Sequence, residues 1–326
     1  MNFKKVLQYI LTLAVIVAAI YFFYLQFEKN ADAISAYNFS INPYYIILSI
    51  IFGIFASLIG PVVWRMFVND YLHKKLNYTE SYTLYCTSAM FKYIPGKVWT
   101  YAAQIALMSS KGISNVVLIY INIVSFICLF FVAAILSLYY YLFCMKVTTF
   151  GISIFVFSLL IFSDIAFIIW SNSIINYLII PVSRVFKVEI QPIKTKKIIF
   201  VYTQMFYFFL IILLSIALYF LARGINIGMP MTNIFAIMIT ICMSGILGYL
   251  AFFSMGGLGV REGTMFFMLK QFSSIEAALI LPVVARILTI IIELLMMIIA
   301  IIIGVKYGYF SKLAKSRTKD IIQRGG

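Results

Sequence analysis

The chain has 326 residues, of which 64% are hydrophobic and only 11% are charged, and its mean hydropathy is +1.06. This composition excludes an ordinary water-soluble globular domain, in which about a quarter of the residues are charged. The bilayer is therefore the expected solvent of most of the chain.

Six apolar runs are each long enough to cross a bilayer core, which needs about 20 residues per helix. The first run follows two lysines but is too long for the core of a signal peptide, so we expect it to be retained. The chain is predicted to be an all-α integral membrane protein with full spans at 6–27, 43–64, 114–142, 150–171, 198–222 and 275–303.

Two further apolar regions are interrupted by helix-breaking residues. Residues 78–110 contain Ile94-Pro95-Gly96-Lys97, and residues 233–273 contain Gly256-Gly257-Leu258-Gly259. These breaks predict two short helices in each region in place of one long helix. We expect both regions to form re-entrant hairpins, each of which enters and leaves the membrane on the same side.

The distribution of Lys and Arg orients the chain, because short loops rich in these residues stay in the cytoplasm. With two re-entrant hairpins, most of the 25 basic residues fall on the side that holds both termini. Helix, break, helix and long span then occur twice with opposite orientation, which is typical of the inverted repeats of transporters. The alternative is a chance similarity between apolar segments.

We therefore expect one polytopic membrane domain over residues 1–310, followed by a basic cytoplasmic tail at 311–326. Its halves are predicted at about 1–182 and 198–310. The linker at 183–197 holds five basic residues and is suited to contact anionic lipid.

Two pairs of residues predict helix starts at the membrane surface. Asn77 with Glu80, and Ser273 with Glu276, have the spacing of N-terminal caps before an apolar run. The first pair would start the first hairpin, and the second would start the last span.

Catalytic and metal-binding patterns are absent from the sequence. The single histidine, His73, has no partner for a catalytic triad. The cysteines lack the paired spacing of a zinc site and sit in apolar segments, at Cys86, Cys128, Cys144 and Cys242.

A charge inside the bilayer costs at least about 2.5 kcal/mol on insertion scales, so a retained charge needs a partner or a polar cavity. Arg286 and Glu293 are seven residues apart, which puts them on one helix face but about 10 Å apart along the axis. We expect both to face the protein interior. The charges predicted at membrane depth are Lys92, Lys97, Asp164, Arg261, Glu262, Arg286 and Glu293.

The second break has the features of an anion site. Its three glycines allow backbone conformations that other residues avoid, and a helix is predicted to start near Val260. The free N–H groups of that helix, with Arg261 beside them, could hold a phosphate. The alternative is a structural cap, in which Glu262 satisfies the helix dipole without a ligand.

The first break presents Lys92, Pro95, Gly96 and Lys97 in a similar way. In a shallow hairpin, however, both lysines would reach the cytoplasmic headgroups and only anchor it. Asp164 has no local partner in the sequence; we expect it to be a counter-ion to one of these cations, and the alternative is a proton carrier.

Around its two breaks the chain resembles the flippase-like family of the lysylphosphatidylglycerol synthase transmembrane region, the membrane half of the bacterial multiple peptide resistance factor. The resemblance rests on Phe91-Lys92-Tyr93-Ile94-Pro95-Gly96-Lys97-Val98-Trp99 and Gly256-Gly257-Leu258-Gly259-Val260-Arg261-Glu262-Gly263. In large members this region moves an aminoacylated phospholipid between leaflets, and a separate cytosolic domain makes that lipid. The resemblance implies lipid transport or binding here, without aminoacyl transfer. Short relatives occur among genes for surface glycolipids.

We therefore expect a flippase-like protein of the bacterial inner membrane that binds an anionic phospholipid or a polyprenyl-linked lipid. No cofactor, metal or nucleic-acid partner is expected, whereas a homo-oligomer or biosynthetic partner proteins are compatible with the sequence. Two alternatives stay open: a membrane-embedded transferase, for which Asp164 and Glu293 are the deep carboxylates, and a non-catalytic scaffold. The predicted substrate-binding residues are Lys92, Pro95, Gly96, Lys97, Gly256, Gly257, Gly259, Arg261, Glu262, Arg286 and Glu293, with Asp164 as the counter-ion.

The charge distribution predicts that both termini are cytoplasmic. Single cysteines placed near Lys29 and Arg223 should react with an impermeant reagent added outside the cell, and cysteines near Lys74 and Lys194 should be protected. External labelling of the 183–197 segment would contradict this topology.

Overall fold

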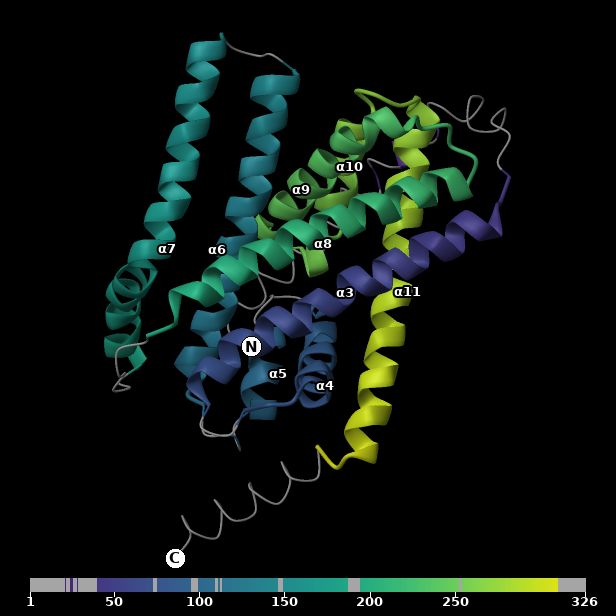
Figure 1. The fold of residues 1–326 in the computed structure, drawn as a ribbon. Coiled ribbons are helices and arrows are strands. Elements are labelled where there is room, and N and C mark those ends of the chain that lie inside the picture. The colour runs from purple at the N-terminus through teal and green to yellow at the C-terminus, as the bar shows by residue number, and fades with distance from the viewer. Residues whose placement is uncertain are drawn as a thin grey trace, which may run out of the picture. The chain divides into compact units, whose positions relative to one another are not determined.

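The computed structural model describes residues 40–309, apart from 73–74, 95–98, 109–110, 112, 146–148, 187–193 and 252–253, together with positions 21, 24, 25 and 28. Over these residues the secondary structure is helical, without a β-strand. The α-helices labelled in Figure 1 are α3 (Pro43–Tyr71), α4 (Tyr78–Ala89), α5 (Trp99–Met108), α6 (Asn115–Tyr139), α7 (Phe150–Phe186), α8 (Lys197–Gly224), α9 (Ile234–Leu250), α10 (Val260–Leu269) and α11 (Ile275–Lys306).

Six helical segments of the described chain are long and apolar enough to cross a membrane: Pro43–Tyr71, Asn115–Cys144, Phe150–Ile174, Lys197–Gly224, Met231–Leu250 and Ile275–Lys306. Five of them confirm spans predicted from the sequence. The predicted span at 6–27 lies almost wholly outside the described residues. The sixth segment lies in the second broken region, where the predicted break into two helices, α9 and α10, is confirmed. The first of these helices is longer than predicted, because α9 together with the 3₁₀ turn η4 (Met231–Asn233) reaches the length of a full span.

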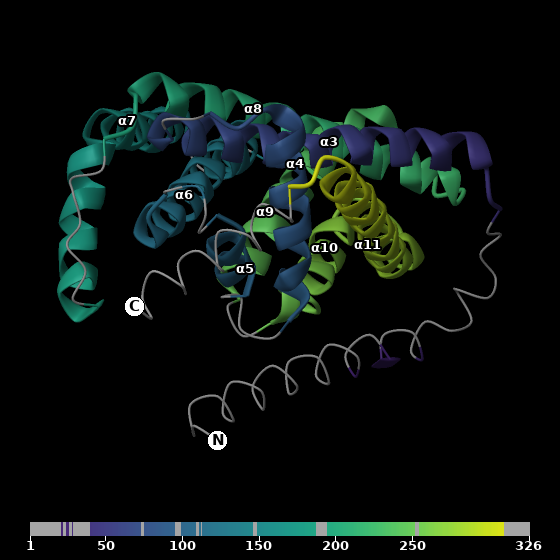
Figure 2. The same ribbon diagram turned by 90° about the horizontal axis from the view of Figure 1, so that it is seen from below.

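The second broken region folds back on itself. Helix α10 packs against α9, and the two helices lie side by side in both ribbon views (Figures 1 and 2). The Asn233 side-chain amide donates to the Phe272 carbonyl at 3.4 Å, which joins the start of α9 to the end of α10. Ten residues of α10 span only about 15 Å, half of a bilayer core. The segment is therefore a helical hairpin whose two ends meet.

The first broken region also has its ends tied together. It consists of α4, the 3₁₀ turn η1 (Met90–Tyr93) and α5, and Pro95, Gly96 and Lys97 lie outside the described residues. An ion pair joins Glu80, in the first turn of α4, to Lys111, just beyond α5. Both hairpins thus return to the place from which they start.

The two predicted helix caps have different outcomes. The Asn77 side-chain oxygen accepts from the Glu80 backbone N–H at 2.8 Å, which confirms the start of α4. At α11 the capping residue is Ser274, whose hydroxyl accepts from the Ala277 N–H at 3.3 Å. The prediction of Ser273 was one residue off, because the Ser273 hydroxyl instead donates to the Leu269 carbonyl at the end of α10.

Two compact units emerge from the contacts. The first comprises Met1–Leu58, Ala89–Thr100 and Phe209–Ile298, and the second comprises Ile59–Ser88, Tyr101–Phe208 and Ile299–Gly326. The predicted halves at 1–182 and 198–310 stay a prediction, since they concern repetition along the chain and not contacts. The core of the first unit is built by apolar side chains of α8, α9, α10 and α11, among them Leu218, Ile237, Phe266, Leu269 and Leu279.

Aromatic and polar contacts hold the second unit together. Phe200 of α8 packs against Phe67 of α3, with ring centroids 5.7 Å apart, and against Phe167 of α7 at 6.0 Å. The hydroxyl of Thr195, just before α8, is hydrogen-bonded to the hydroxyls of Tyr71 and Tyr120. The end of the predicted linker is therefore fixed to α3 and α6.

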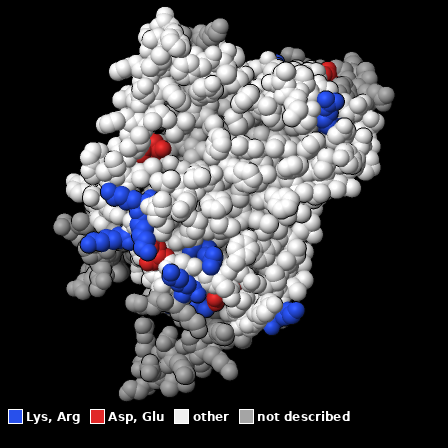
Figure 3. Space-filling model, in the orientation of Figure 1, with Lys and Arg blue, Asp and Glu red and all other residues white. Residues whose placement is uncertain are grey.

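Charged side chains take up little of the surface in view. On the face shown in Figure 3, most of the described surface belongs to residues other than Lys, Arg, Asp and Glu. A surface with few charges is what contact with lipid requires.

The ion pair that closes the first hairpin should be energetically coupled. Its side chains are partly buried, with 25% of Lys111 and 14% of Glu80 exposed. Glu80→Gln and Lys111→Gln should each lower the unfolding temperature, and the double variant should lose less than the two single losses together. We expect a coupling of about 1 kcal/mol from thermal unfolding in detergent. Strictly additive losses would show that the pair does not close the hairpin.

Candidate functional site

The second break is built on glycines in the left-handed region. Gly256, Gly257 and Gly259 have φ angles of 55°, 79° and 83°, where other residues are strained. A Cβ on Gly256 would lie 3.2 Å from an Arg286 nitrogen and 3.3 Å from the Tyr93 ring. Helix α10 starts at Val260, as the sequence predicts. The glycines therefore permit both the turn and the close approach of two side chains.

Glu262 occupies the N-terminus of α10. Its Oε2 accepts from the Gly259 N–H at 2.7 Å, and the residue is only 7% exposed. The structure therefore contains the predicted cap, in which the protein's own carboxylate matches the positive end of the helix dipole. Binding of an anion beside this cap stays a prediction.

Arg286 ties α11 to the second break. Its Nη2 donates to the Gly256 carbonyl at 3.0 Å, and its Nε lies 3.3 Å from Oε1 of Glu262. The Arg286 side chain is 10% exposed and that of Glu262 is 9% exposed. This buried ion pair joins α10 and α11 directly.

Glu293 ties α11 to the first break. Its Oε1 accepts from Lys92 Nζ at 2.5 Å, and its Oε2 accepts from the Tyr93 hydroxyl at 2.6 Å. The Arg286 guanidinium also lies over the Tyr93 ring, 5.7 Å from its centroid. The 3₁₀ turn η1 also packs against the 3₁₀ turn η5 (Met255–Gly257). The described charged residues of the two breaks and of the middle of α11 therefore form one cluster within the first unit: Lys92, Arg261, Glu262, Arg286 and Glu293.

Arg261 is the cation of this cluster that lacks a carboxylate partner among the described residues. Its side chain packs on two glycines. A Cβ atom added to Gly248 would lie 2.4 Å from Arg261 Cγ, and a Cβ atom added to Gly257 would lie 3.2 Å from the same atom. The guanidinium lies over the Tyr249 ring, 5.6 Å from its centroid. Its Nε is buried without a hydrogen-bond acceptor in the described structure. The Arg261 side chain thus lies against the backbone of α9 and forms no ion pair in the described structure.

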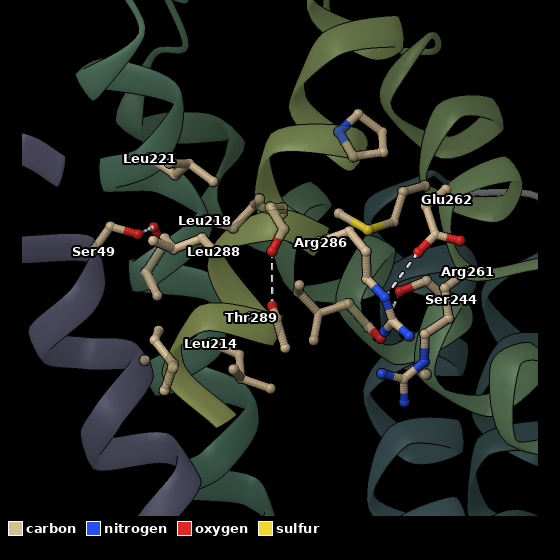
Figure 4. A pocket seen from close by; sticks show the side chains of 18 residues that line it. Ser49, Leu214, Leu218, Leu221, Ser244, Arg261, Glu262, Arg286, Leu288 and Thr289 are labelled. Atoms are coloured by element: carbon tan, nitrogen blue, oxygen red, sulfur yellow. Dashed lines mark hydrogen bonds and ion pairs between the residues drawn. The ribbon is translucent and has the colours of Figure 1, made fainter. Parts of the chain in front are cut away.

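A cavity of about 180 Å³ opens beside the cluster. Figure 4 shows Ser244, Arg261, Glu262 and Arg286 on one side, whereas Leu218 and Leu221 lie on the other. The remaining walls are largely apolar and come from α3, α8, α9, α10 and α11 of the first unit. The cavity therefore has a charged end and an apolar end.

The predicted site residues are only partly brought together. Lys92, Arg261, Glu262, Arg286 and Glu293 share the cluster, with the three glycines of the second break. Pro95, Gly96 and Lys97 lie outside the described residues. Asp164 belongs to the second unit, where Oδ1 accepts from the Gln204 side-chain amide at 2.5 Å; its role as a counter-ion stays a prediction.

Several contributors to the site were not predicted from the sequence. Tyr93 bridges the two breaks, Tyr249 stacks with Arg261, and Ser49 and Gly245 line the cavity. The small residues Ser244 and Gly248 lie four apart on α9, a spacing that indicates close helix packing. This pattern could have predicted that α9 forms the cavity wall beside Arg261. No such signal marks the tyrosines, because aromatic residues are common throughout this chain.

Comparison with known proteins identifies the family of this chain. No curated protein sequence matches the chain significantly. Residues 9–296 match the family described as the lysylphosphatidylglycerol synthase TM region, a range that includes both breaks, the charged cluster and its cavity. This multi-pass membrane protein therefore belongs to the lysylphosphatidylglycerol synthase TM region family.

Proposed function

We propose that this protein is a lipid flippase that binds the anionic headgroup of a phospholipid or a polyprenyl-linked lipid at the cluster around Arg261. The observation that carries the proposal is Arg261 at the charged end of a largely apolar cavity: its Nε is buried without a hydrogen-bond acceptor, and the guanidinium has no carboxylate partner in the described structure. The protein is proposed to act in the bacterial cytoplasmic membrane with both termini in the cytoplasm.

The energetics of Arg261 support an anionic ligand. An uncompensated cation away from water is costly, and a phosphate beside it would offset much of that cost. The planar guanidinium presents several N–H donors that match phosphate oxygens in pairs. Arg286 and Lys92, in contrast, are already engaged by Glu262 and Glu293. Arg261 is therefore the group with which a headgroup phosphate would pair.

The cavity walls support an amphiphilic ligand. Leu214, Leu218, Leu221, Met265 and Ile292 line it together with the charged residues. A free inorganic anion would gain nothing from these apolar side chains, whereas an acyl or prenyl chain would bury apolar surface against them. The combination of an apolar wall and one unmatched cation favours a lipid over a soluble anion.

The two hairpins support the proposal that the protein moves its lipid across the membrane. Each has its ends joined, by Glu80 with Lys111 and by Asn233 with Phe272, as re-entrant segments require. Broken helices that approach the midplane from opposite sides are the usual substrate sites of transporters with inverted repeats. Both Glu293 oxygens are already hydrogen-bonded, an arrangement that suits a structural carboxylate better than the catalytic base of a transferase.

Removal of the Arg261 charge should weaken lipid binding. In the purified protein, Arg261→Ala should reduce binding of phosphatidylglycerol by about tenfold or more, and Arg261→Lys should restore only part of it, because lysine keeps the charge but loses the paired donors. Native mass spectrometry or a fluorescent-lipid titration would measure this, with flipping followed in reconstituted vesicles.

The matched control is Lys270→Ala, which removes an exposed basic residue of the same unit and should leave binding unchanged. Normal binding and flipping by a folded Arg261→Ala protein would contradict the proposed site. If inorganic phosphate stabilised the protein as much as lipid does, the site would be one that binds a free anion and not a lipid.

Filling the cavity should block binding without unfolding the protein. Gly245 lines the cavity, and a Cβ built there meets no atom within 4 Å. Gly245→Leu should therefore abolish lipid binding while its unfolding temperature stays equal or rises, since glycine is a poor helix former. Gly151→Leu is the control, because Gly151 is exposed and also has free space around it. Unchanged binding by Gly245→Leu would exclude the cavity as the lipid site.

A further inference from the structure

We propose that Asp164 is a proton-binding site of the second unit, and that its proton couples the protein to the proton gradient across the membrane. The sequence left two roles open for this residue, a counter-ion and a proton carrier, and the surroundings of the carboxyl favour the second. The proton site is independent of the charged cluster around Arg261, whereas its coupling to lipid movement rests on the proposed function.

Asp164 lies deep in a membrane-spanning helix. It is ten residues before the end of the apolar segment Phe150–Ile174, which corresponds to about 15 Å along the helix axis. The residue is 8% exposed. One turn further along α7, the Phe167 ring packs against Phe131 of α6 and Phe200 of α8, with centroids 5.4 and 6.0 Å away. The carboxyl is therefore held where α6, α7 and α8 meet.

These three helices offer Asp164 no nearby cation. Helix α6 contains no Lys or Arg, α7 contains only Arg184, and α8 contains only Lys197 and Arg223. Arg184 is 20 residues from Asp164, or about 30 Å along α7. Lys197 and Arg223 are at the two ends of α8, 7 and 19 residues from Gln204, which is the residue of α8 that binds Asp164. In the described structure Asp164 forms no ion pair.

The other titratable groups packed around this site supply no positive charge either. The Cys128 thiol of α6 lies close enough to Asp164 to interact with it electrostatically, but a thiol is only a weak hydrogen-bonding group. Helix α3 also packs against α8, and its charged residues are engaged elsewhere. Arg65 donates to a backbone carbonyl of the following loop, and Asp70 accepts from the Lys196 backbone N–H.

The hydrogen-bond partner of Asp164 suits a group that gains and loses a proton. Its Oδ1 accepts from the Gln204 side-chain amide at 2.5 Å. An amide carries a donor and an acceptor, so after a rotation it can bind the neutral acid as well as the carboxylate, whereas an arginine can only donate. A carboxylate with one neutral partner in apolar surroundings is costly. The protonated form is therefore the stable one while the three helices are packed together.

Polar side chains on α7 lead from Asp164 toward the 183–197 linker. Ser171, two turns later on the same face of the helix, is fully buried. The next residue, Asn172, binds the backbone of Thr195 through two hydrogen bonds of 3.0 Å. Both chain neighbours of Thr195 are exposed. Water on the linker side of the membrane is therefore the phase with which Asp164 would exchange its proton.

Release of the proton requires a change in the packing of the helices. The O–H bond of Asp164 breaks, the proton goes to water, and the electron pair stays on the carboxylate, which then needs water around it. Water can enter only if α7 and α8 separate on the linker side. Proton binding thus favours the packed arrangement and proton release favours an open one, so a proton gradient shifts the population between them.

Infrared spectroscopy of the protein in nanodiscs, with isotopically labelled aspartate, tests the proton directly. At neutral pH the parent should show the C=O stretching band of a neutral carboxylic acid that moves with the label. The band should be absent from Asp164→Asn, whose amide keeps the contact with Gln204. Gln204→Lys should also remove it, because a cation beside Asp164 stabilises the carboxylate.

The control is Asp70→Asn. Asp70 belongs to the same unit and is bound by the Lys196 N–H, so this variant should keep the band. Absence of a label-sensitive neutral-acid band from the parent would overturn the proposal, whether or not the variants fold. Persistence of the band in a folded Asp164→Asn protein would assign the proton to another aspartate and would overturn it as well.

The coupling is tested in vesicles that hold a pH difference, a trace of labelled phosphatidylglycerol and no membrane potential. If one proton moves with each lipid, a difference of one pH unit should shift the distribution of the lipid between leaflets by up to about tenfold with the parent protein. Asp164→Asn should bind the lipid as the parent does but give a distribution that ignores the gradient, and Asp70→Asn should respond like the parent.

A parent distribution that ignores the gradient would overturn the coupling, and a response by Asp164→Asn would overturn the role of this residue in it. If the parent moves no lipid under any condition, the proposed function is contradicted instead. The infrared bands still decide in that case whether Asp164 binds a proton.

Discussion

The carboxylate of Glu262 joins the parts on which the rest of the first unit depends. One oxygen caps α10 through the Gly259 N–H, and the other pairs with Arg286 of α11. Arg286 in turn binds the Gly256 carbonyl and lies over Tyr93. Because a buried charge without a partner is costly, each of these groups holds the next one in place.

The glycines make this arrangement possible by bringing side chains close to the backbone. Gly256 lies between Arg286 and Tyr93, and Gly248 lets the Arg261 stem lie against α9. A side chain at Gly256 would push the guanidinium from its carbonyl, and one at Gly248 would push Arg261 out of its packed position. At the second break the glycines therefore do more than end a helix: they let charged side chains approach the backbone closely.

The same cluster supports the lipid site that we propose. Two of its cations are paired with carboxylates, and the third, Arg261, lines a cavity whose remaining walls are largely apolar. A ligand that combines a phosphate with a hydrocarbon chain satisfies both ends. Membership of the lysylphosphatidylglycerol synthase TM region family is consistent with the proposed lipid ligand.

The sequence by itself determined the features that depend on neighbours along the chain. Apolar length placed five of the spans, the glycines at 256, 257 and 259 indicated the left-handed turn, and the start of α10 at Val260 followed from them. It also predicted which charges lie at membrane depth. Only the tertiary structure decided how those charges pair, since Glu293 meets Lys92 across 201 residues and Glu262 takes Arg286 while Arg261 stays unmatched. Such pairing depends on how helices that are distant in the sequence pack together, and the local periodicity of a sequence does not predict that packing.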